Sequence, residues 1–447
     1  MSGKAWNVPK PVNVISSEIY CADPTAAEFR GRLYVYGTND HQQYREGKTG
    51  SNTYEAIRSL VVFSTGDMVN WQYHGEIRVG EIAPWIYASW APSIIAREES
   101  DGLTHFYLYF SNSGCGVGVI TSTDPVSGWR DPLGKPLIEA GMPTLGDVPN
   151  PFDPGAALDA QGNGWLTFGG GVAKNGSPAM PRTARIVRLG ADLISLGSEF
   201  SEIPAPYFYE ASELNILGDT FLYTFNTNWE PRTDWHQTDA APATRCSMCC
   251  MTTKTPLDSA SWQYRRDYFA NPGDQGCPDS NNHTHLHNFC GQWYLFYHTL
   301  QREAAIGETG GYRALCVTPS AADAENGCGK TVIAEVKQLR PLDPFTAHAA
   351  AECFSASGIT FVTDGNGTVT GVRAEEAGAW ICVRGADFGD AGACGFVPQI
   401  TGGTAALLLD SPEGSAVSFD APLTGCHDLY LVLSDAGCVL TNWQFTA

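Results

Sequence analysis

The sequence has few positive charges and few charges of either sign. Lys and Arg total 27 residues against 48 Asp and Glu, so the formal net charge is −21, and charged residues make up only 17% of the chain. An acidic protein repels phosphates, which argues against nucleic acid and against an anionic membrane surface as partners. A neutral ligand is compatible with this composition.

Long hydrophobic runs are also missing. No apolar stretch reaches the ~20 residues of a transmembrane helix. The first residues, MSGKAWNVPKPVNVIS, contain no apolar segment of the kind found in signal peptides. We therefore expect a cytoplasmic protein. The alternative is a secreted protein whose signal peptide has been removed.

The 14 cysteines follow no paired spacing. Their one cluster, Cys246, Cys249 and Cys250, has no second Cys-x-x-Cys that would complete a zinc site. We predict that the thiols are reduced, as expected for a cytoplasmic protein.

A long helical pattern is absent, whereas turn residues are abundant, with 48 glycines and 27 prolines. Hydrophobic residues account for 43% of the 447 positions, which is typical of a globular chain with two or three domains. Together these features predict an all-β protein with many turns.

Five units of roughly 60 residues recur along the chain, each with short strands and a glycine-containing first turn. The units start with CADPTAAEFRGRLYVYG, WIYASWAPSII, PFDPGAALDAQGNGWLTFGG, YFYEASELNILGDTFLYTF and NNHTHLHNFCGQWYLFYH. The last unit is expected to continue with GYRALCVTPS and to end with the strand KTVIAEV, residues 330–336. This repetition predicts a five-bladed β-propeller over residues 1–340.

The composition and the hydrophobic pattern of the sequence change after the predicted propeller. A Pro- and Ala-rich linker, QLRPLDPFTAHAA at 338–350, is expected to close the ring of blades. Residues 351–447 then show sparse charge and short alternating runs such as TAALLLDS and HDLYLVLSD. This pattern predicts a separate, small β-sandwich.

One carboxylate, Glu210, lies in the aromatic run that starts the fourth unit. Tyr207, Phe208 and Tyr209 precede it, and Gly218-Asp219 supplies the turn of a predicted hairpin. Aromatic neighbours desolvate a carboxyl group and raise its pKa, as a general acid at neutral pH requires. The alternative for this stretch alone is a surface glutamate ahead of a strand.

Two more carboxylates occupy equivalent positions near the first strands of their units, Asp23 in the first and Asp153 in the third. Because the innermost strands of a propeller line its channel, we expect these groups and Glu210 to converge at one mouth. Hydrolysis of a glycosidic bond with inversion uses a charged base and a protonated acid, about 6.5–9.5 Å apart. Each aspartate precedes a proline, so the alternative is a pair of ordinary turn residues. Asp159, in LDAQGN, is predicted to be a turn residue, and Glu213 fits the acid position less well than Glu210.

The five motifs resemble glycoside hydrolase family 43, in the order of that family and over about residues 13–340. The strings that carry the resemblance are CADPTA, SWAPSI, NPFDPGAALDAQGNGWLTFGG, YFYEASELNILGDTFLYTF and NNHTHLHNFCGQWYLFYH. The family consists of five-bladed propellers that cleave arabinose or xylose from plant polysaccharides with inversion. The resemblance implies that Asp23 is the general base, that Glu210 is the general acid, and that Asp153 raises the pKa of Glu210 and orients it.

The resemblance also implies a histidine in NNHTHLH that helps to hold a hydrated calcium ion or lies near the catalytic base. His283, His285 and His287 alternate, so on a strand they would share one face. The register favours His283 as the metal- and substrate-binding residue, with His285 second. Calcium prefers oxygen ligands, so water would hold most of the ion. A zinc site made by the three histidines is the alternative.

Two further positions match the family. Arg313, in GGYRAL, corresponds to an arginine that reaches the active site and contacts the substrate or the base. Trp90, in SWAPS, corresponds to an aromatic residue at the pocket wall, where the C–H faces of sugars stack. The alternative for Trp90 is a packing role inside its blade.

The C-terminal segment resembles, more loosely, a family 6 carbohydrate-binding module, through GAWICVRGADFG and TGCHDLYLVLSDAGCVLTNWQF. Trp380 is expected in the core. Trp443 either faces a ligand cleft or is buried. The domain accordingly either binds sugar or braces the propeller.

The resulting prediction is an inverting, exo-acting glycoside hydrolase. It would release terminal α-L-arabinofuranose or β-D-xylose from arabinoxylan, arabinan or their oligosaccharides. The alternatives are an endo-arabinanase, a non-catalytic sugar-binding propeller and a glycoside phosphorylase. The three acids argue against a pure binding protein, and a phosphorylase would need a cationic phosphate pocket that this acidic chain does not suggest.

Overall fold

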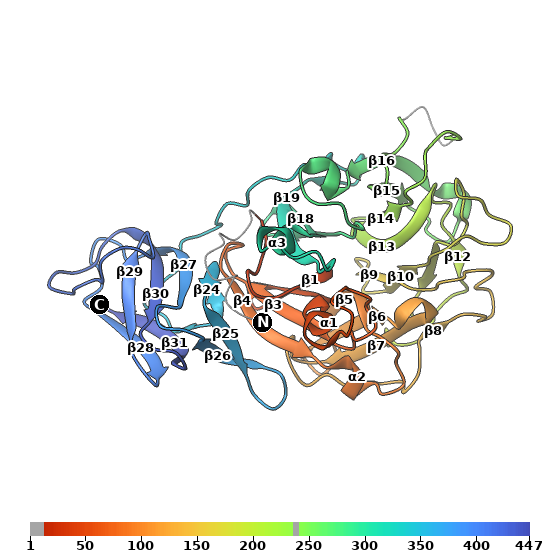
Figure 1. Cartoon of the computed structure of the whole chain (residues 1–447). Coiled ribbons are helices and arrows are strands. Elements are labelled where there is room, and N and C mark those ends of the chain that lie inside the picture. The colour runs from red at the N-terminus through yellow and green to blue at the C-terminus, as the bar shows by residue number, and fades with distance from the viewer. Residues whose placement is uncertain (1–12, 236–240) are drawn as a thin grey trace.

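A computed structural model of the protein describes residues 13–235 and 241–447, and nearly all of its regular structure is β (Figure 1). Residues 1–12, on which the prediction about a signal peptide rests, lie outside the described residues. The helices are short: α1 (Asp40–Glu46), α2 (Val79–Ile82), α3 (Gln301–Ala305), and the 3-10 turns Ser113–Cys115, Ser259–Ser261 and Pro272–Gln275. No helix within the described ranges is long and apolar enough to cross a membrane.

Each of the first four sequence units forms one antiparallel sheet in which the strands follow chain order. The first blade contains β1 (Ala22–Phe29), β2 (Arg32–Thr38), β3 (Leu60–Thr65) and β4 (Trp71–Ile77). The second contains β5 (Trp90–Glu98), β6 (Thr104–Ser111), β7 (Gly116–Ser122) and β8 (Ile138–Glu139). The third contains β9 (Gly155–Leu158), β10 (Gly164–Phe168), β11 (Arg185–Arg188) and β12 (Ser201–Glu202). The fourth contains β13 (Phe208–Leu217), β14 (Thr220–Thr227), β15 (Met248–Thr253) and β16 (Gln263–Phe269).

The fifth blade is made of β17 (His285–Phe289), β18 (Gln292–Thr299) and β19 (Ala314–Pro319), followed by the small hairpin of β20 (Ala322–Asp323) and β21 (Gly327–Cys328). First strands of neighbouring blades are in contact around the centre, β1 with β5, β5 with β9, β9 with β13, and β17 with β1 (Figure 1). The predicted all-β fold with a five-bladed β-propeller is confirmed.

The inner strands approach each other closely at Gly155 in β9. A Cβ atom there would lie 2.5 Å from the Cα of Glu213 in β13, so only glycine allows this contact. The contact brings the third and fourth blades together beside Asp153 and Glu210.

The N-terminal residues close the ring of blades. Val14 bridges antiparallel to Cys316 of β19, and the backbone N–H of Ile15 donates to the carbonyl of Leu315 at 2.8 Å. Within 330–336 the structure has no strand, and Val332 is 70% exposed, whereas Val14 is 2% exposed. The predicted strand at 330–336 and the predicted closure by the linker 338–350 are therefore wrong, because the buried apolar side chains at the N-terminus fill that place.

Two packed sheets form the C-terminal part, drawn in blue in Figure 1. One sheet contains β22 (His348–Ala349), β31 (Val439–Thr446), β26 (Val369–Ala374), β25 (Ile359–Thr363) and β28 (Gly395–Thr401). The other contains β24 (Ser355–Ser357), β27 (Trp380–Asp387), β30 (Cys426–Leu433) and β29 (Ala405–Leu409). This arrangement confirms the predicted β-sandwich.

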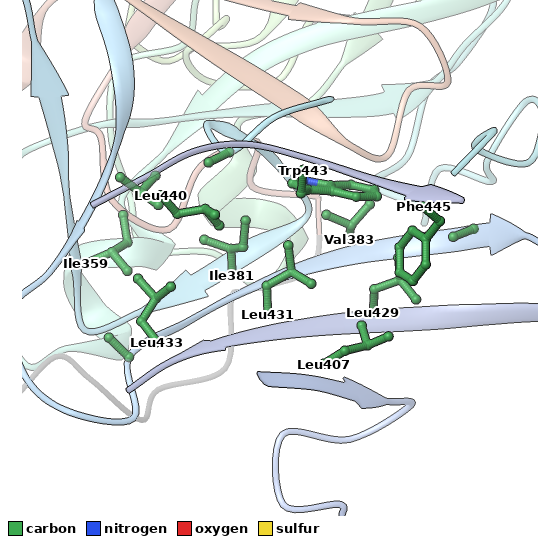
Figure 2. Packing of buried hydrophobic residues seen from close by; sticks show 14 of the residues in the cluster. Ile359, Ile381, Val383, Leu407, Leu429, Leu431, Leu433, Leu440, Trp443 and Phe445 are labelled. Carbon is green, nitrogen blue, oxygen red and sulfur yellow. The ribbon is translucent and has the colours of Figure 1, made fainter. Parts of the chain in front are cut away.

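The sandwich core lies between these sheets (Figure 2). Leu429, Leu431 and Leu433 of β30 face Leu440 and Trp443 of β31, and all five side chains belong to one buried cluster. Burial of such apolar area is the main stabilising contribution of this domain.

The two tryptophans of the module-like segment differ in position. Trp443 is 1% exposed, and His348 stacks on its ring with a centroid distance of 4.7 Å. Trp443 is therefore buried, and it does not face a ligand cleft. Trp380 is only partly buried and packs edge-on against Tyr430 outside the core cluster, so its predicted core position is wrong.

A short strand links the C-terminal part to the propeller. In β23 (Glu352–Cys353), Glu352 pairs with Gln72 and Cys353 with Trp71, so β23 becomes the outer strand of the first blade. The carboxylate of Glu352 also accepts a 2.9 Å hydrogen bond from Arg32 of β2. The division into domains at 1–340 and 351–447 stays a prediction, and the pairing of 352–353 shows how closely the two parts are joined.

Candidate active site

The three predicted carboxylates lie at irregular points of the backbone: Asp23 and Glu210 in the inner strands β1 and β13, and Asp153 two residues before β9. Asp23 and Asp153 have positive φ values of 51° and 50°, and Ala211, directly after Glu210, has φ 60°. The ladders of β1 and β13 shift register at these points. Left-handed backbone at residues other than glycine is strained and is concentrated at functional sites, where bulges re-aim side chains.

Asp23 is 5% exposed and is surrounded by hydrogen-bond donors. Its Oδ1 accepts from Nη1 of Arg313 at 2.9 Å, and its Oδ2 accepts from the hydroxyl of Thr38 at 2.7 Å. Burial is the largest single influence and raises the pKa of Asp23. The attractions of Arg313, His283 and His298 and the hydrogen bond from Thr38 together outweigh it and lower the pKa to about 2. Asp23 is therefore a charged carboxylate at neutral pH.

Arg313, which follows the last loop before β19, is held in place by Asp40 of α1. Its Nε and Nη2 donate to the two carboxylate oxygens of Asp40, each at 2.9 Å, in the fork geometry that arginine favours. Arg313 is 3% exposed and Asp40 is fully buried. Asp40 fixes the guanidinium group of Arg313, so that the remaining nitrogen of this group, Nη1, points at Asp23.

Asp153 connects three blades. Its backbone N–H donates to the hydroxyl of Ser111 at 2.8 Å, and its Oδ2 accepts from the backbone N–H of Ala211 at 2.9 Å. Burial raises the pKa of Asp153 to about 7, with repulsion from Glu210 and Asp23 acting in the same direction against the attraction of His283.

Glu210 lies in β13 between two register shifts. Burial and then repulsion from Asp23 raise the pKa of Glu210 to about 7, against a hydrogen bond from Asn281 and the attraction of Arg313. Since Asp153 and Glu210 repel one another, the two groups together keep at least one proton below about pH 7. The structure thus brings the three predicted carboxylates together, with a charged group at Asp23 and at least one proton on the pair of Asp153 and Glu210.

Two neighbouring acids take no part in this arrangement. Glu213 is 2% exposed, and its carboxylate lies 3.2 Å from Nδ1 of His285. Asp159 accepts the backbone N–H groups of Gln161 and Asn163 at 3.0 and 2.9 Å, which is the role of a turn residue, as predicted.

The three histidines of NNHTHLH separate in the structure. His285 and His287 lie in β17, whereas His283 precedes the strand, so the expectation that all three share one strand face is wrong. Nδ1 of His283 lies 3.6 Å from Oδ1 of Asp23 and 3.8 Å from Oδ2 of Asp153. His285 accepts from the backbone N–H of Ala26 at 3.2 Å, and its Nδ1 lies 3.2 Å from the carboxylate of Glu213.

The site offers no direct ligand set for a metal ion. Among residues 13–235 and 241–447, no three His, Cys, Asp or Glu side chains gather in a way that could hold one. The oxygen atoms of Asp23 and Asp153 nearest His283 already accept hydrogen bonds from Arg313 and Ala211. A calcium ion at His283 therefore fits only if water supplies most of its coordination.

Trp90 begins β5 and is partly buried. Its indole N–H donates to the carbonyl of Tyr54 at 3.2 Å, and the two rings meet edge-on at 6.0 Å. The guanidinium carbon of Arg313 lies 5.0 Å from the centre of the Tyr54 ring. Trp90 is thus one aromatic ring away from the arginine that contacts Asp23.

Five further residues of the site are not among those predicted from the sequence: Thr38, Asp40, Tyr54, Asn281 and His298. The sequence carries a signal for two of them, since Thr38 and Asp40 belong to GTND, at the end of the second strand of the first blade. Tyr54 and Asn281 lie in loops, where no periodic pattern marks them.

A charged carboxylate and a protonated carboxyl group, held at one mouth of a five-bladed β-propeller, define the site of a glycoside hydrolase. The sequence profile described as Glycosyl hydrolases family 43 matches residues 13–324. The chain belongs to this family.

Individual relatives extend the similarity beyond the propeller. The arabinoxylan arabinofuranohydrolase of Bacillus subtilis (strain 168) is 34% identical over 474 aligned residues, which cover 95% of this chain and 90% of the relative. The crystal structure of a family 43 arabinoxylan arabinofuranohydrolase from Bacillus subtilis in complex with cellotetraose has a TM-score of 0.86 at 30% identity, covering 97% of this chain and 99% of that one.

A third comparison concerns calcium. The family 43 β-xylosidase/α-arabinofuranosidase CoXyl43, from a compost microbial metagenome, has been solved with xylotriose in a form described as calcium-free. It shares the fold with a TM-score of 0.53 at 20% identity, covering 72% of this chain and 98% of that one.

Proposed function

We propose that this glycoside hydrolase releases α-L-arabinofuranose side groups from arabinoxylan or its oligosaccharides, with inversion at the anomeric carbon. The observation that carries the proposal is the similarity to the arabinoxylan arabinofuranohydrolase of Bacillus subtilis, because it covers 95% of this chain and thus includes the C-terminal sheets. The buried carboxylates supply the chemistry for such a reaction.

In the proposed reaction Asp23 is the general base. Its carboxylate takes a proton from a water molecule, and the water oxygen forms a bond to the anomeric carbon of the arabinose. Arg313 and Thr38 hold the carboxylate charged and fix both of its oxygens. The low pKa of about 2 keeps this base available across the working range of pH.

Glu210 is the general acid of the proposal. As the bond from the anomeric carbon to the glycosidic oxygen breaks, its proton passes to that oxygen, which becomes a hydroxyl group of the xylan chain. The raised pKa of about 7 keeps this proton on Glu210 near neutral pH. Asp153 supports the acid by like-charge repulsion and by binding the backbone N–H of Ala211.

The alternatives share this chemistry and differ in the sugar or the bond. A β-xylosidase would release xylose from chain ends, and an endo-arabinanase would cut inside arabinan. A sugar-binding propeller would have no use for a base and an acid whose pKa values are held apart. Substrate tests separate these possibilities.

The experiment combines aryl glycosides with polymers. The purified enzyme is given aryl α-L-arabinofuranoside, β-D-xyloside, β-D-galactofuranoside and β-D-galactoside, and then arabinoxylan and linear arabinan. We expect free arabinose from arabinoxylan, and NMR of the first-formed sugar should show the inverted anomer. Xylose as the main product, or internal cleavage of arabinan without arabinose from arabinoxylan, would overturn the proposal.

We further propose that a hydrated calcium ion lies near His283, with His283 as the only protein ligand and no step of the reaction assigned to the ion. Support comes from the position of His283 beside two carboxylates, at 3.6 and 3.8 Å. Elemental analysis of the purified protein before and after chelation tests it. Calcium bound in wild type and lost in His283→Ala supports the site, and equal calcium contents in both proteins contradict it.

We also propose a cytoplasmic location, which would favour imported oligosaccharides as substrates and exo action on them. Cell fractionation with an antibody against the enzyme tests the location. Recovery in the culture medium would contradict it.

A further inference from the structure

His298 is a buried histidine that the proposed reaction does not use. It lies in β18 with no exposed surface, directly beside Asp23. The backbone N–H of Asp23 donates to Nδ1 of His298 at 3.2 Å. Because Nδ1 accepts this hydrogen bond, the neutral ring carries its proton on Nε2.

The protonated nitrogen points at Asn281, in the loop before β17. Nε2 of His298 lies 3.0 Å from the backbone oxygen and 3.1 Å from Oδ1 of Asn281, so it donates to both. Since the amide oxygen of Asn281 accepts from His298, its NH2 group is left to face Glu210, and the Asn281 side chain is close enough to lower the pKa of that carboxyl group.

We propose that His298 and Asn281 are positioning residues that tie the general acid Glu210 to the strand that carries the general base Asp23. The connection runs from the Asp23 backbone through the imidazole ring and the Asn281 amide to the Glu210 carboxyl group. This inference rests on the proposed roles of Asp23 and Glu210.

An inverting reaction requires the base and the acid to keep a fixed relative position, which such a connection would provide. The base and the acid must act on opposite sides of the anomeric carbon, with room for one water molecule beside the base. Asp23 lies in β1 and Glu210 in β13, on different blades, so packing within a blade cannot fix their relation. A small displacement of one catalytic group costs roughly 100-fold in rate.

A neutral histidine suits this role. Burial lowers the pKa of His298, and Arg313 lowers it further, to about 3, so the ring stays uncharged at neutral pH. Its one donor and one acceptor each have a partner, and it adds no charge next to Asp23. The charged or titratable groups around His298 and Glu210 are Asp23, Asp153, Arg313, His283, Tyr54, Tyr209 and Cys246.

A positioning role and a merely structural role predict different rates on substrates with different leaving groups. The acid matters for natural linkages and much less for aryl glycosides with acidic phenols, whereas the base matters for both. In Asn281→Ala, we expect kcat on arabinoxylan oligosaccharides to fall roughly 10- to 100-fold and kcat on an activated aryl arabinofuranoside to change less than about threefold. Asn281 is only partly buried and lies in a loop, so this variant should keep the wild-type Tm.

Two substitutions of His298 form a matched pair of variants. In His298→Asn, the side-chain oxygen replaces Nδ1 as acceptor for Asp23, but the shorter side chain cannot reach Asn281, so the loss should again be confined to natural linkages. In His298→Gln, the longer amide replaces the Nε2 donor and leaves the Asp23 N–H without its acceptor, so both substrate types should lose activity.

The double variant His298→Asn/Asn281→Ala should be no slower on natural linkages than Asn281→Ala alone, because the two residues act in one chain. Equal losses on both substrate types in Asn281→Ala, or additive losses in the double variant, would overturn the proposal. If a His298 variant fails to fold, the leaving-group ratio of Asn281→Ala decides alone. Failure of the proposed function itself is distinct, because wild type would then release no arabinose.

Discussion

The backbone N–H of Ala211 donates to Oδ2 of Asp153 at 2.9 Å. Ala211 directly follows Glu210, so the aspartate of the third blade holds the strand segment that presents the acid of the fourth. One carboxylate thereby has two effects on Glu210: it sets the position of the backbone, and its charge opposes ionisation of Glu210.

Asp153→Asn separates these effects. The amide oxygen can still accept from Ala211, while the negative charge is lost, so the pKa of Glu210 should fall from about 7. Wild-type kcat/KM should decline above about pH 7, where Glu210 loses its proton. In Asp153→Asn this alkaline limb should move to lower pH. A limb that stays in place, measured on arabinoxylan oligosaccharides, would contradict the role of Asp153.

Glu210→Ala and Asp23→Ala should fail in different ways. Without the acid, natural linkages should lose roughly 100-fold or more in kcat, whereas aryl glycosides with acidic phenols need no protonation and should lose far less. Without the base, both substrates should lose at least about 100-fold. Steady-state rates on the two substrate types check this. An equal loss on both substrate types in Glu210→Ala would contradict the role of Glu210 as the acid. Substantial turnover by Asp23→Ala would contradict the role of Asp23 as the base.

Arg313→Lys should be a severe change although it preserves charge. Lysine carries one ammonium group, which cannot donate to both oxygens of Asp40 and to Asp23 at once. We expect kcat to fall roughly 10- to 100-fold. The pKa of Asp23 should rise from about 2, which moves the acid limb of the pH profile upward.

A matched control for this change is Arg45→Lys. Arg45 forms a 3.1 Å ion pair with Glu76, and its side chain is 46% exposed, so the substitution should leave the rate unchanged. An equal loss in both variants would show that the site does not depend on the fork of Arg313.

Trp443→Ala should destabilise the C-terminal sandwich. The side chain is 1% exposed and packs in the core between the two sheets, so truncation should cost about 3–5 kcal/mol of unfolding free energy. Trp380→Ala is the control, because that ring is partly exposed and contacts Tyr430 outside the core; a loss of about 1–2 kcal/mol is expected. Chemical denaturation followed by tryptophan fluorescence and circular dichroism measures both. Comparable losses would contradict the assigned positions.

The sequence was sufficient for the blades and for the three carboxylates because both are local signals. Each of Asp23, Asp153 and Glu210 stands at the start of a recurring hairpin motif, so its place in one blade predicts its place at the common mouth. The turn at Gly218-Asp219 likewise follows from its two residues, and β13 and β14 pair on either side of it.

The residues that surround the carboxylates could not be predicted in this way. Asp40 and Arg313 are 273 positions apart, and Asp23 and His298 are 275 apart, so only the closed ring brings them together. The same applies to closure by Val14, whose partner Cys316 is in the last blade. His283 looked like part of an alternating strand, but β17 begins two residues later.

The pairing of β23 with β4 also protects the first blade from other chains. Besides the β23 pairs, the backbone N–H of Tyr73 donates to the carbonyl of Ala351 at 3.1 Å. The rings of Phe361 and Tyr73 also pack together, with a centroid distance of 4.9 Å. Removal of the C-terminal part would bare the backbone of β4 and the aromatic side chains next to it. Uncovered edges of this kind recruit strands from other molecules and lead to aggregation. The C-terminal part therefore covers an edge of the propeller that would otherwise be open to strands of other molecules, whether or not it touches a polysaccharide.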